Sequence, residues 1–551
     1  MEARPCRMIE FFDGTKQMLV PLFQRPYEWD VGSWQTLWDD IMEHYNRAED
    51  DPPDASHFTG AIVTAPARSV PVGVSKYLVI DGQQRLTTLA ILLCAIRNRM
   101  PTEHRQYRQI SRLLLNEDYE GTDLYKLLPT QPDRPAWVSL LEDPRRSPAS
   151  RFLRAFRFFV ERLEGKDDDD LPIDPHRLFE TVQQRLHVVF INLGENDDPY
   201  LIFESLNYKG TPLTQADLVR NYLLLRLQTG AQEKIYQQHW LPMQERLRDA
   251  LPEFVRQYLM QKGEEVAKGD VYSVLKKRTL AVSDALMPAE IERLNAASVH
   301  YQYIIDPRTV KNARLQRSLT RLLRWEMATC HPLLLRLYTG HATGDVTDAE
   351  LIDCLEIIES FGVRRYICGV PTNQLKRIFL SLMGVVQRGQ TAANLRANLA
   401  KGSLGRRWPK DVEFKAAWLK FRLYSRPVDR CKFILESLED AHGHREGGDP
   451  SAATIEHIMP QTLSPAWREA LGANAEATHE QWLHTVGNLT LSAYNSELSN
   501  SAFGRKKDML ADSHFELNRS VVAQADWDAV AIEQRAGALC TLAQNVWARP
   551  P

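Results

Sequence analysis

The sequence predicts an α+β fold that is mostly helical, and three observations carry this prediction. Residues 1–230 mix short apolar runs of strand type with helical patterns, whereas residues 231–400 show almost only apolar residues at helical spacing. Residues 401–551 change character again after a Gly-containing, basic break. Because 551 residues exceed what one core usually holds, we expect one domain or region in each of these ranges, with an α/β domain first and a helical region in the middle.

The composition is that of an ordinary globular protein, and it limits the function classes. Hydrophobic residues make up 44% of the chain and charged residues 25%. No apolar run is long enough to span a membrane and the first residues lack a secretion signal, so we expect no membrane partner and a cytoplasmic location. The seven cysteines are scattered without a CxxC pair, which argues against a zinc ribbon and a disulfide framework. With a formal net charge of -3, any surface that binds nucleic acid must be local.

In the N-terminal part, short apolar runs alternate with helical patterns. Thr214 precedes the last of the expected helices and Asp217 follows three residues later, which favours an N-cap at Thr214. We expect strands or extended segments at 18–23, 58–64, 77–80 and 187–192, and helices at 34–45, 86–96 and 215–228.

The nine residues 81–89, Asp-Gly-Gln-Gln-Arg-Leu-Thr-Thr-Leu, join the strand at 77–80 to the helix at 86–96. A tight glycine turn that opens a helix presents backbone N–H groups and the positive end of the helix dipole, and both favour a phosphate. Arg85 adds a planar cation that suits phosphate oxygens. The sequence therefore predicts an anion site here. The other interpretation is a buried turn in which Asp81 and Arg85 pair.

A second set of polar residues lies near the C-terminus. Glu456 and His457 are followed by Asn488 and then by Asn495, which is the order of an HNH, or ββα-metal, nuclease. Hydrolysis of a phosphodiester needs a base with a pKa near neutral, a role that suits His457. It also needs a hard divalent cation, so we expect Glu456 and Asn495 to hold Mg²⁺ or Mn²⁺. Asn488 is expected to orient the His457 ring.

Several neighbouring residues leave alternatives open. A single histidine before Ile-x-Pro is also typical of a strand end whose ring is satisfied locally. Asn500 competes with Asn495 as the metal ligand, because spacing alone does not separate them. Lys506 is a candidate for contact with the substrate. We interpret His479 and His484 as surface residues.

Four arginines recur along one helical segment of the middle region. A phosphate-binding stripe and a solvated basic face both fit such a pattern, and the solvated face is the commoner case. The four, which share one helix face, are Arg314, Arg317, Arg321 and Arg324.

With both ends in view, the chain resembles the GmrSD-like family of modification-dependent, type IV restriction enzymes. The resemblance covers almost the whole length and looks like the fused form, in which a GmrS-type half precedes a GmrD-type half. The phosphorothioate-sensing nuclease of Ssp phage-defence systems is similar in layout. The segments that carry the resemblance are 23–29, 57–60, 81–89 and 203–210 in the N-terminal half, and 408–409, 432–436, 456–461 and 487–491 in the C-terminal half.

The resemblance implies an N-terminal ParB-like domain that binds and hydrolyses a nucleoside triphosphate, GTP or another ribonucleotide. ParB-like relatives also favour a homodimer. Asp81 and Arg85 would be the catalytic groups of this site, and Asn207 and Lys209 would contact phosphate. The nucleotide site would use five residues of the motif: Asp81, Gly82, Gln83, Gln84 and Arg85.

The turn at 24–29 has two interpretations. On the resemblance, Gln24, Arg25 and Tyr27 form a second wall of the pocket or sense the DNA backbone. On the residues alone, the turn is an aromatic-rich segment that packs on the core, since buried Tyr and Trp are normally core residues with a polar handle.

The leading hypothesis is a DNA endonuclease or nickase of antiphage defence, regulated by a nucleoside triphosphate and sensing DNA modification. Its partners are then phage or modified DNA and the nucleotide, and its cofactor is Mg²⁺ or Mn²⁺. One alternative is a nucleotide-switched DNA-binding protein with a non-catalytic HNH fold. Another is a nuclease that acts on RNA, because the ββα-metal site does not itself read the 2′-OH.

Overall fold

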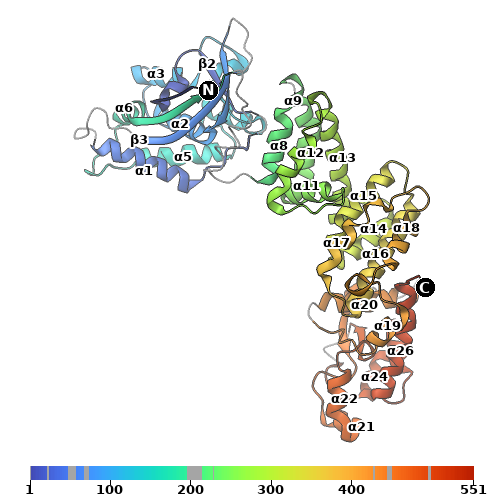
Figure 1. Ribbon diagram of the computed structural model, residues 1–551. Helices are drawn as coiled ribbons and strands as arrows, with labels where there is room; N and C mark the ends of the chain where they lie inside the picture. The colour runs from blue at the N-terminus through green and yellow to red at the C-terminus, as the bar shows by residue number, and fades with distance from the viewer. Residues whose placement is uncertain are drawn as a thin grey trace. The chain divides into compact units, whose positions relative to one another are not determined.

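The computed structural model describes residues 2–21, 24–47, 57–66, 73–194, 214–227, 229–425, 428–443, 450–493 and 498–550. Within them, an N-terminal mixed sheet with its helices precedes a long series of helices and a short C-terminal sheet (Figure 1). The predicted α+β, mostly helical fold is therefore confirmed. The chain forms two compact units, Met1–Leu241 with Leu275–Ile291 and Pro242–Val274 with Glu292–Pro551. The division into domains at 230 and 400 stays a prediction.

In the described part of the first unit, six strands form one mixed sheet. Their order is β1-β6-β3-β4-β2-β5; β6 runs parallel to β3, and β2 runs parallel to β4 and β5. The strands expected at 58–64, 77–80 and 187–192 are confirmed. The segment expected at 18–23 ends its strand at Leu19, since Pro21 has no N–H to continue the ladder. The strands are β1 (Glu2–Arg7), β2 (Lys16–Leu19), β3 (His57–Pro66), β4 (Ser75–Asp81), β5 (Leu127–Leu128) and β6 (Leu186–Asn192).

The helices expected at 34–45, 86–96 and 215–228 correspond to α1, α2 and α8 of the first unit. The N-cap at Thr214 is confirmed, because its hydroxyl accepts a hydrogen bond from the Asp217 N–H at 3.2 Å, and the Asp217 carboxylate accepts one from the Thr214 N–H at 3.3 Å. The helices of this unit are α1 (Val31–Arg47), α2 (Gln83–Asn98), α3 (Arg105–Leu114), α4 (Arg134–Glu142), α5 (Arg151–Leu163), α6 (Pro175–Arg185), α8 (Gln215–Leu225) and α9 (Thr229–Ile235).

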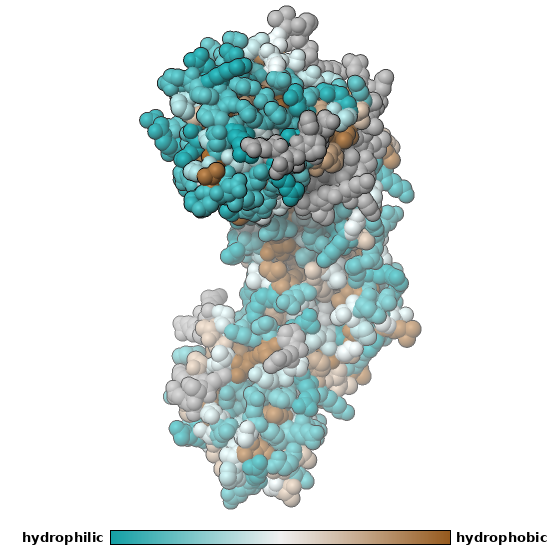
Figure 2. Space-filling model, turned by 90° about the vertical axis from the view of Figure 1, so that its left-hand side faces the viewer, coloured by the Kyte–Doolittle hydropathy of each residue, from teal (hydrophilic) through white to brown (hydrophobic). Residues whose placement is uncertain are grey.

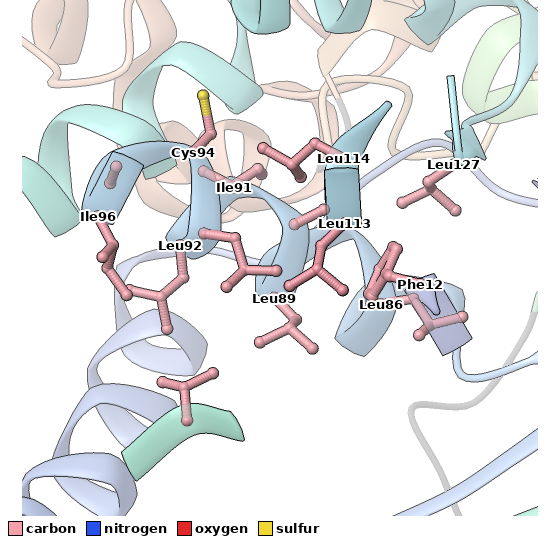
Figure 3. Close-up of a cluster of buried hydrophobic side chains, with 14 of the residues drawn as sticks. Phe12, Leu86, Leu89, Ile91, Leu92, Cys94, Ile96, Leu113, Leu114 and Leu127 are labelled. Atoms are coloured by element: carbon pink, nitrogen blue, oxygen red, sulfur yellow. The ribbon is translucent and has the colours of Figure 1, made fainter. Parts of the chain in front are cut away.

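Helix α2 lies at the centre of the first core. Its side chains are buried on every side from Leu86 to Ile96 (Figure 3), as expected of a helix that is apolar all round. Helices α3 and α5 pack against it, and β4 pairs with strands on both of its sides. The turn between β4 and α2, which contains Gly82, is therefore held in a fixed position.

The described part of the second unit is helical apart from one pair of strands, β7 (Thr454–His457) and β8 (Leu489–Ser492). The helical pattern of residues 231–400 is confirmed. Three helices hold residues of both units: α10 (Leu241–Leu247), α12 (Val271–Thr279) and α13 (Met287–Ile305). The others are α11 (Leu251–Met260), α14 (Ala313–Arg324), α15 (His331–Ala342), α16 (Asp348–Ile367), α17 (Leu375–Leu380), α18 (Thr391–Ala400), α19 (Asp411–Trp418), α20 (Val428–Asp440), α21 (Pro465–Leu471), α22 (Ala475–Trp482), α24 (Phe503–Ala511), α25 (Glu516–Val522) and α26 (Ala529–Val546).

The arginine face of α14 lies at the surface, and three of its four arginines form ion pairs. Arg321 pairs with Glu359 of α16 at 2.6 Å. The next arginine, Arg324, pairs with Glu436 of α20 at 2.5 Å, and Arg317 pairs with Asp440 at 2.9 Å. Three of the four arginines are exposed, as the solvated interpretation expects, and carboxylates from two packed helices pair with three of the four.

Among the described residues, no helix combines the length and the apolar character that a membrane crossing requires. The face shown in Figure 2 is mostly hydrophilic, and its hydrophobic residues gather in smaller groups. The most exposed large hydrophobic side chains include Leu404 and Val412, which is ordinary for a protein surface.

Candidate functional site

The C-terminal strand pair positions the Glu-His motif. β7 runs antiparallel to β8, with Glu456 opposite Thr490 and His457 opposite Leu489, and helix α24 follows β8 in the chain. The order strand, strand, helix is the one that the motif spacing predicts. Asn495, the expected metal ligand between β8 and α24, lies outside the described residues.

Glu456 takes part in a buried ion pair. The ammonium of Lys506, on α24, has no exposed surface and donates to Glu456 Oε1 at 2.7 Å and to the His457 carbonyl at 2.7 Å. Burial raises the pKa of Glu456, while Lys506 beside it lowers that pKa. Burial lowers the pKa of Lys506. The expectation that Lys506 contacts the substrate is wrong. Its ammonium is buried inside the protein, where it pairs with Glu456 and holds the strand that carries His457.

No hydrogen bond joins the Asn488 side chain to the His457 ring, both being described, so the structure does not support the orienting role expected of Asn488. Its Oδ1 accepts hydrogen bonds from the Met459 N–H at 2.7 Å and from Trp527 Nε1 at 3.0 Å. Its amide donates to the carbonyls of Met459 and Leu483, both at 2.9 Å. All four bonds are buried, and they fix the chain two residues beyond His457. Asn488 therefore positions the backbone of the motif rather than its side chain.

The partner of the His457 ring is a residue that the sequence did not single out. His484 Nδ1 lies 3.3 Å from His457 Nε2, and which of the two nitrogens donates depends on the tautomers. Tyr424 stacks on His484 with ring centroids 5.6 Å apart and meets His457 edge-on at 4.6 Å. His484 is half-buried rather than fully exposed, and the surface interpretation missed its contact with His457. His479 is also half-buried and bonds the Pro460 carbonyl at 2.9 Å.

No pattern in the sequence marks His484 or Tyr424 for this role. They come from segments far apart in the chain, and only the packing around β7 brings them together. The sequence contains one weak signal. His484 lies four residues before Asn488, close to the strand that pairs with β7.

The His457 ring is held in its neutral form. Its side chain is 5% exposed, and this burial lowers its pKa to about 3, with the neighbouring His484, Lys506 and His479 charges acting in the same direction. A neutral imidazole has a free lone pair at pH 7 and can accept a proton. The structure therefore places an unprotonated imidazole at the end of β7, and its pKa lies below the near-neutral value expected of a general base.

Arg535 of α26 holds the segment that leads into β8. Its guanidinium donates to the carbonyls of Gly487 and Leu489, both at 2.8 Å, and to that of Leu517 at 3.1 Å. Burial lowers its pKa to about 9. A Cβ at Gly487 would collide with the Ile532 carbonyl of the same helix, so the glycine of the motif permits this close approach.

The described residues offer only part of a metal site. No three His, Cys, Asp or Glu side chains gather around one point in the described ranges. Glu456 can supply one carboxylate oxygen, because its bond to Lys506 uses the other. Asn500 is exposed and makes no hydrogen bond to Glu456 or His457.

At the other end of the chain, the β4–α2 turn has the form of an anion site. Gly82 has φ 91° and caps α2 without a side-chain hydrogen bond, and a Cβ on it would lie 2.8 Å from Ile62. The first N–H groups of any helix lack acceptors within it. Arg85 donates to the Ala61 carbonyl, and no hydrogen bond or ion pair joins it to Asp81, both being described. The alternative of an Asp81–Arg85 pair is therefore wrong.

The two glutamines of this motif bind the turn at 24–29. Gln84 Oε1 accepts from the N–H groups of Glu28 at 2.9 Å and Trp29 at 3.3 Å. Gln83 Nε2 donates to the Arg25 carbonyl at 3.0 Å and to Gln24 Oε1 at 3.3 Å. Both side chains are buried and committed to this loop. Contact of these two residues with a nucleotide stays a prediction. Because their side chains bind the loop, such a contact would use their backbone N–H groups.

The turn itself packs on the core. Gln24 Nε2 donates to the Ile80 carbonyl at 2.8 Å. The Tyr27 hydroxyl lies 2.8 Å from Thr88 Oγ1 and accepts from Trp34 Nε1 at 2.8 Å, and burial raises its pKa. The structure thus favours the aromatic-turn interpretation for Gln24 and Tyr27. Arg25 stays half-buried beside Glu28, at 3.2 Å.

Two predicted phosphate contacts cannot be placed. Asn207 and Lys209 lie outside the described residues. The described part of the predicted nucleotide site therefore consists of the Gly82 turn, the first turn of α2 and Arg85.

Both motifs fall inside known family domains. Residues 8–224 match the model of the GmrSD restriction endonuclease N-terminal domain, and residues 408–542 match that of the GmrSD C-terminal domain. The chain belongs to the GmrSD family. The two matches cover well over half of the chain, stand in the order of the fused form, and make the protein a type IV restriction nuclease that acts on DNA. No curated protein matches the chain.

Within this GmrSD protein, each family domain contains one of the two motifs. The N-terminal match includes the Gly82 turn and α2, and the C-terminal match includes β7, β8 and α24. The resemblance drawn from the sequence is confirmed for the family as a whole. The roles of individual residues rest on the geometry above.

Proposed function

We propose that the protein is an HNH-type DNA endonuclease or nickase of antiphage defence, dependent on a divalent metal and regulated by a nucleoside triphosphate. The observation that carries this proposal is the placement of the His457 imidazole at the end of β7, next to Glu456 in the chain and with His484 Nδ1 3.3 Å from its Nε2. A module that only docks on DNA has no need of a histidine and a carboxylate held together in this way. Sensing of modified DNA is the restraint that would protect the host.

In the proposed reaction, His457 accepts a proton from the attacking water. His484 and Tyr424 keep its ring in place, and Asn488 fixes the backbone that follows. Glu456, with Asn495, would hold Mg²⁺ or Mn²⁺, which would supply positive charge opposite the phosphate oxygens. Lys506 keeps the Glu456 carboxylate in position through its hydrogen bond to Oε1.

We further propose that the nucleotide binds at the first turn of α2. Its backbone N–H groups and the helix dipole favour phosphate oxygens, and Arg85 stands on the same turn with one amino group anchored on Ala61. Asp81, at the end of β4, would be the second catalytic group of this site, as the family resemblance implies. Asn207 and Lys209 would complete this site.

The experiment uses purified full-length protein and measures which substrate is cut. Supercoiled plasmid, linear duplex and single-stranded RNA are incubated with Mg²⁺ or with EDTA, each with and without GTP or ATP. Nicking or linearisation of DNA that requires Mg²⁺ and changes with the nucleotide is the expected result. Faster cleavage of RNA than of DNA would overturn the substrate class. If plain, phosphorothioated and glycosylated DNA all stay intact, the nuclease proposal fails and the nucleotide-switched binding protein becomes the better account.

A further inference from the structure

A cavity of about 520 Å³ lies in the first unit, away from the Gly82 turn. Its volume is within the usual range for sites that hold a small ligand. One wall is a face of α5, and the other is the end of the turn at 24–29 together with the start of α1. The side chains that matter here are four arginines and two tryptophans: Arg151, Arg154, Arg157, Arg162, Trp29 and Trp34.

The arginines of this cavity differ from those of α14. Arg154 and Arg157 are exposed, three residues apart on one helix face, and neither makes a hydrogen bond or an ion pair within the described ranges. Of the two carboxylates in the lining, Asp30 is already used, since it accepts from the Ser33 N–H at 3.3 Å. The other carboxylate is Glu161, and two carboxylates against four arginines leave the lining with an excess of positive charge. This cavity is therefore an attractive site for an anion.

The same cavity offers aromatic faces. Trp29 is half-buried in its wall, and Trp34 forms its floor, fixed through its Nε1 bond to Tyr27. The Arg162 guanidinium lies over the Phe158 ring, 5.2 Å from its centroid. A concave surface that combines unpaired arginines with an accessible tryptophan suits a nucleotide unit, in which a flat base adjoins a phosphate.

The wall of the cavity is joined to the predicted nucleotide site. Gln84, in the first turn of α2, accepts hydrogen bonds from the N–H groups of both Glu28 and Trp29. From the other side, Arg151 donates to the Glu28 carbonyl at 2.5 Å. Movement of the α2 turn would therefore be transmitted to Trp29 through one side chain.

We propose that this cavity binds the DNA substrate, with strand phosphates on Arg154 and Arg157 and a base against Trp29. This inference rests on the proposed function in that DNA is the substrate. The phosphate and base of a free nucleoside triphosphate share the same chemistry. We assign the cavity to the DNA strand because Arg154 and Arg157 are exposed on one face of α5, and because backbone donors for a triphosphate are already present at the Gly82 turn.

The test measures equilibrium binding rather than cleavage. Full-length protein carrying His457→Ala is titrated against a fluorescent DNA duplex and against the matching single strand. The titrations are repeated at salt concentrations from about 50 to about 300 mM, because the slope of affinity against salt reports the number of phosphate contacts. The same protein with Arg154→Ala and Arg157→Ala is compared with a matched control, Arg105→Ala with Arg108→Ala, an exposed pair three residues apart on α3. Binding of a fluorescent GTP analogue is measured in parallel.

The expected result is a loss of DNA affinity of about tenfold or more for the α5 pair, with a salt dependence that is shallower by about two ions. The α3 pair and GTP binding should be unchanged. As a second variant, Trp29→Leu should weaken single-strand binding by about fivefold or more, since stacking of a base is worth roughly 1–3 kcal/mol.

Two results would overturn the inference. One is equal DNA affinity and equal salt dependence for the α5 and α3 pairs. The other is a loss of GTP binding with DNA binding intact, which would assign the cavity to the free nucleotide. Because binding is read without cleavage, a protein that binds DNA through α5 and cuts nothing would sink the nuclease proposal alone.

Discussion

The two motifs of this GmrSD protein are held in place by different kinds of interaction. Around the β4–α2 turn, neutral amides of Gln83 and Gln84 hold the structure and the backbone donors keep no fixed counter-charge. Around β7 and β8, charged groups are buried: Lys506 against Glu456, and Arg535 against carbonyls. A site of neutral amides suits a ligand that comes and goes, whereas buried charges fix one geometry and tolerate little change.

The largest expected effect breaks the charged side of this comparison. Lys506→Met leaves the Glu456 carboxylate buried without its partner, and we expect it to lower the free energy of unfolding by about 3–5 kcal/mol. Urea unfolding followed by tryptophan fluorescence measures this. Lys507→Met is the control, because that half-buried ammonium bonds a neutral acceptor, the Gln524 carbonyl, and its loss should cost about 1 kcal/mol or less. Equal losses for the two variants would show that the pair does not hold the site.

Asn488→Ala should follow in size. It leaves the Met459 N–H, the Trp527 Nε1–H and two carbonyls without partners in a buried place. We expect a loss of about 2–3 kcal/mol in the free energy of unfolding, read by the same urea titration. If stability stays within about 0.5 kcal/mol of the wild type, the four hydrogen bonds are not what fixes the chain after His457.

His484→Ala tests positioning without a large change in stability. The His457 ring would lose its polar neighbour at 3.3 Å, so kcat should fall by about 10- to 100-fold while KM for DNA stays nearly constant. His484→Asn keeps a polar atom near the place of Nδ1 and should recover most of the rate. His514→Ala, at an exposed position, is the control. A rise in KM with kcat unchanged would instead make His484 a substrate contact.

The smallest effect is expected on the neutral side. Gln84→Leu removes the acceptor of the Glu28 and Trp29 N–H groups and should lower the stability of the first unit by about 1–2 kcal/mol. The substitution changes the loop at 24–29 beside the predicted nucleotide site and leaves the second unit, with His457, unchanged. The nucleotide dependence of cleavage should therefore weaken while the rate without nucleotide stays the same. Loss of the basal rate as well would show that the loop serves cleavage directly.

Local patterns predicted what neighbours in sequence decide. The strand at 77–80, the Gly82 turn and α2 follow from an apolar run, a glycine and a helix apolar on every side. The capping box at Thr214 follows from residue types three positions apart. The strand pair around His457 belongs to the same class, since the motif spacing implied it.

Long-range packing decided what the sequence could not predict. His484 and Tyr424 reach His457 from segments that share no pattern with it. Lys506 looked like a substrate contact because a lysine is usually exposed, and its burial depends on Glu456, fifty residues earlier. The ion pairs of the α14 arginines were not predicted, because their carboxylate partners belong to two other helices. In each case the partner, not the residue, set the role.

The most direct test of the account is the rate of DNA cleavage by His457→Ala. It is measured at saturating Mg²⁺ beside the wild type and beside His514→Ala, with thermal unfolding to confirm that all three are folded. The account predicts a loss of about 100- to 10,000-fold for His457→Ala, as expected when a general base is removed, and no change for His514→Ala. Cleavage by a folded His457→Ala protein at the wild-type rate would contradict it and place the nuclease chemistry elsewhere in the chain.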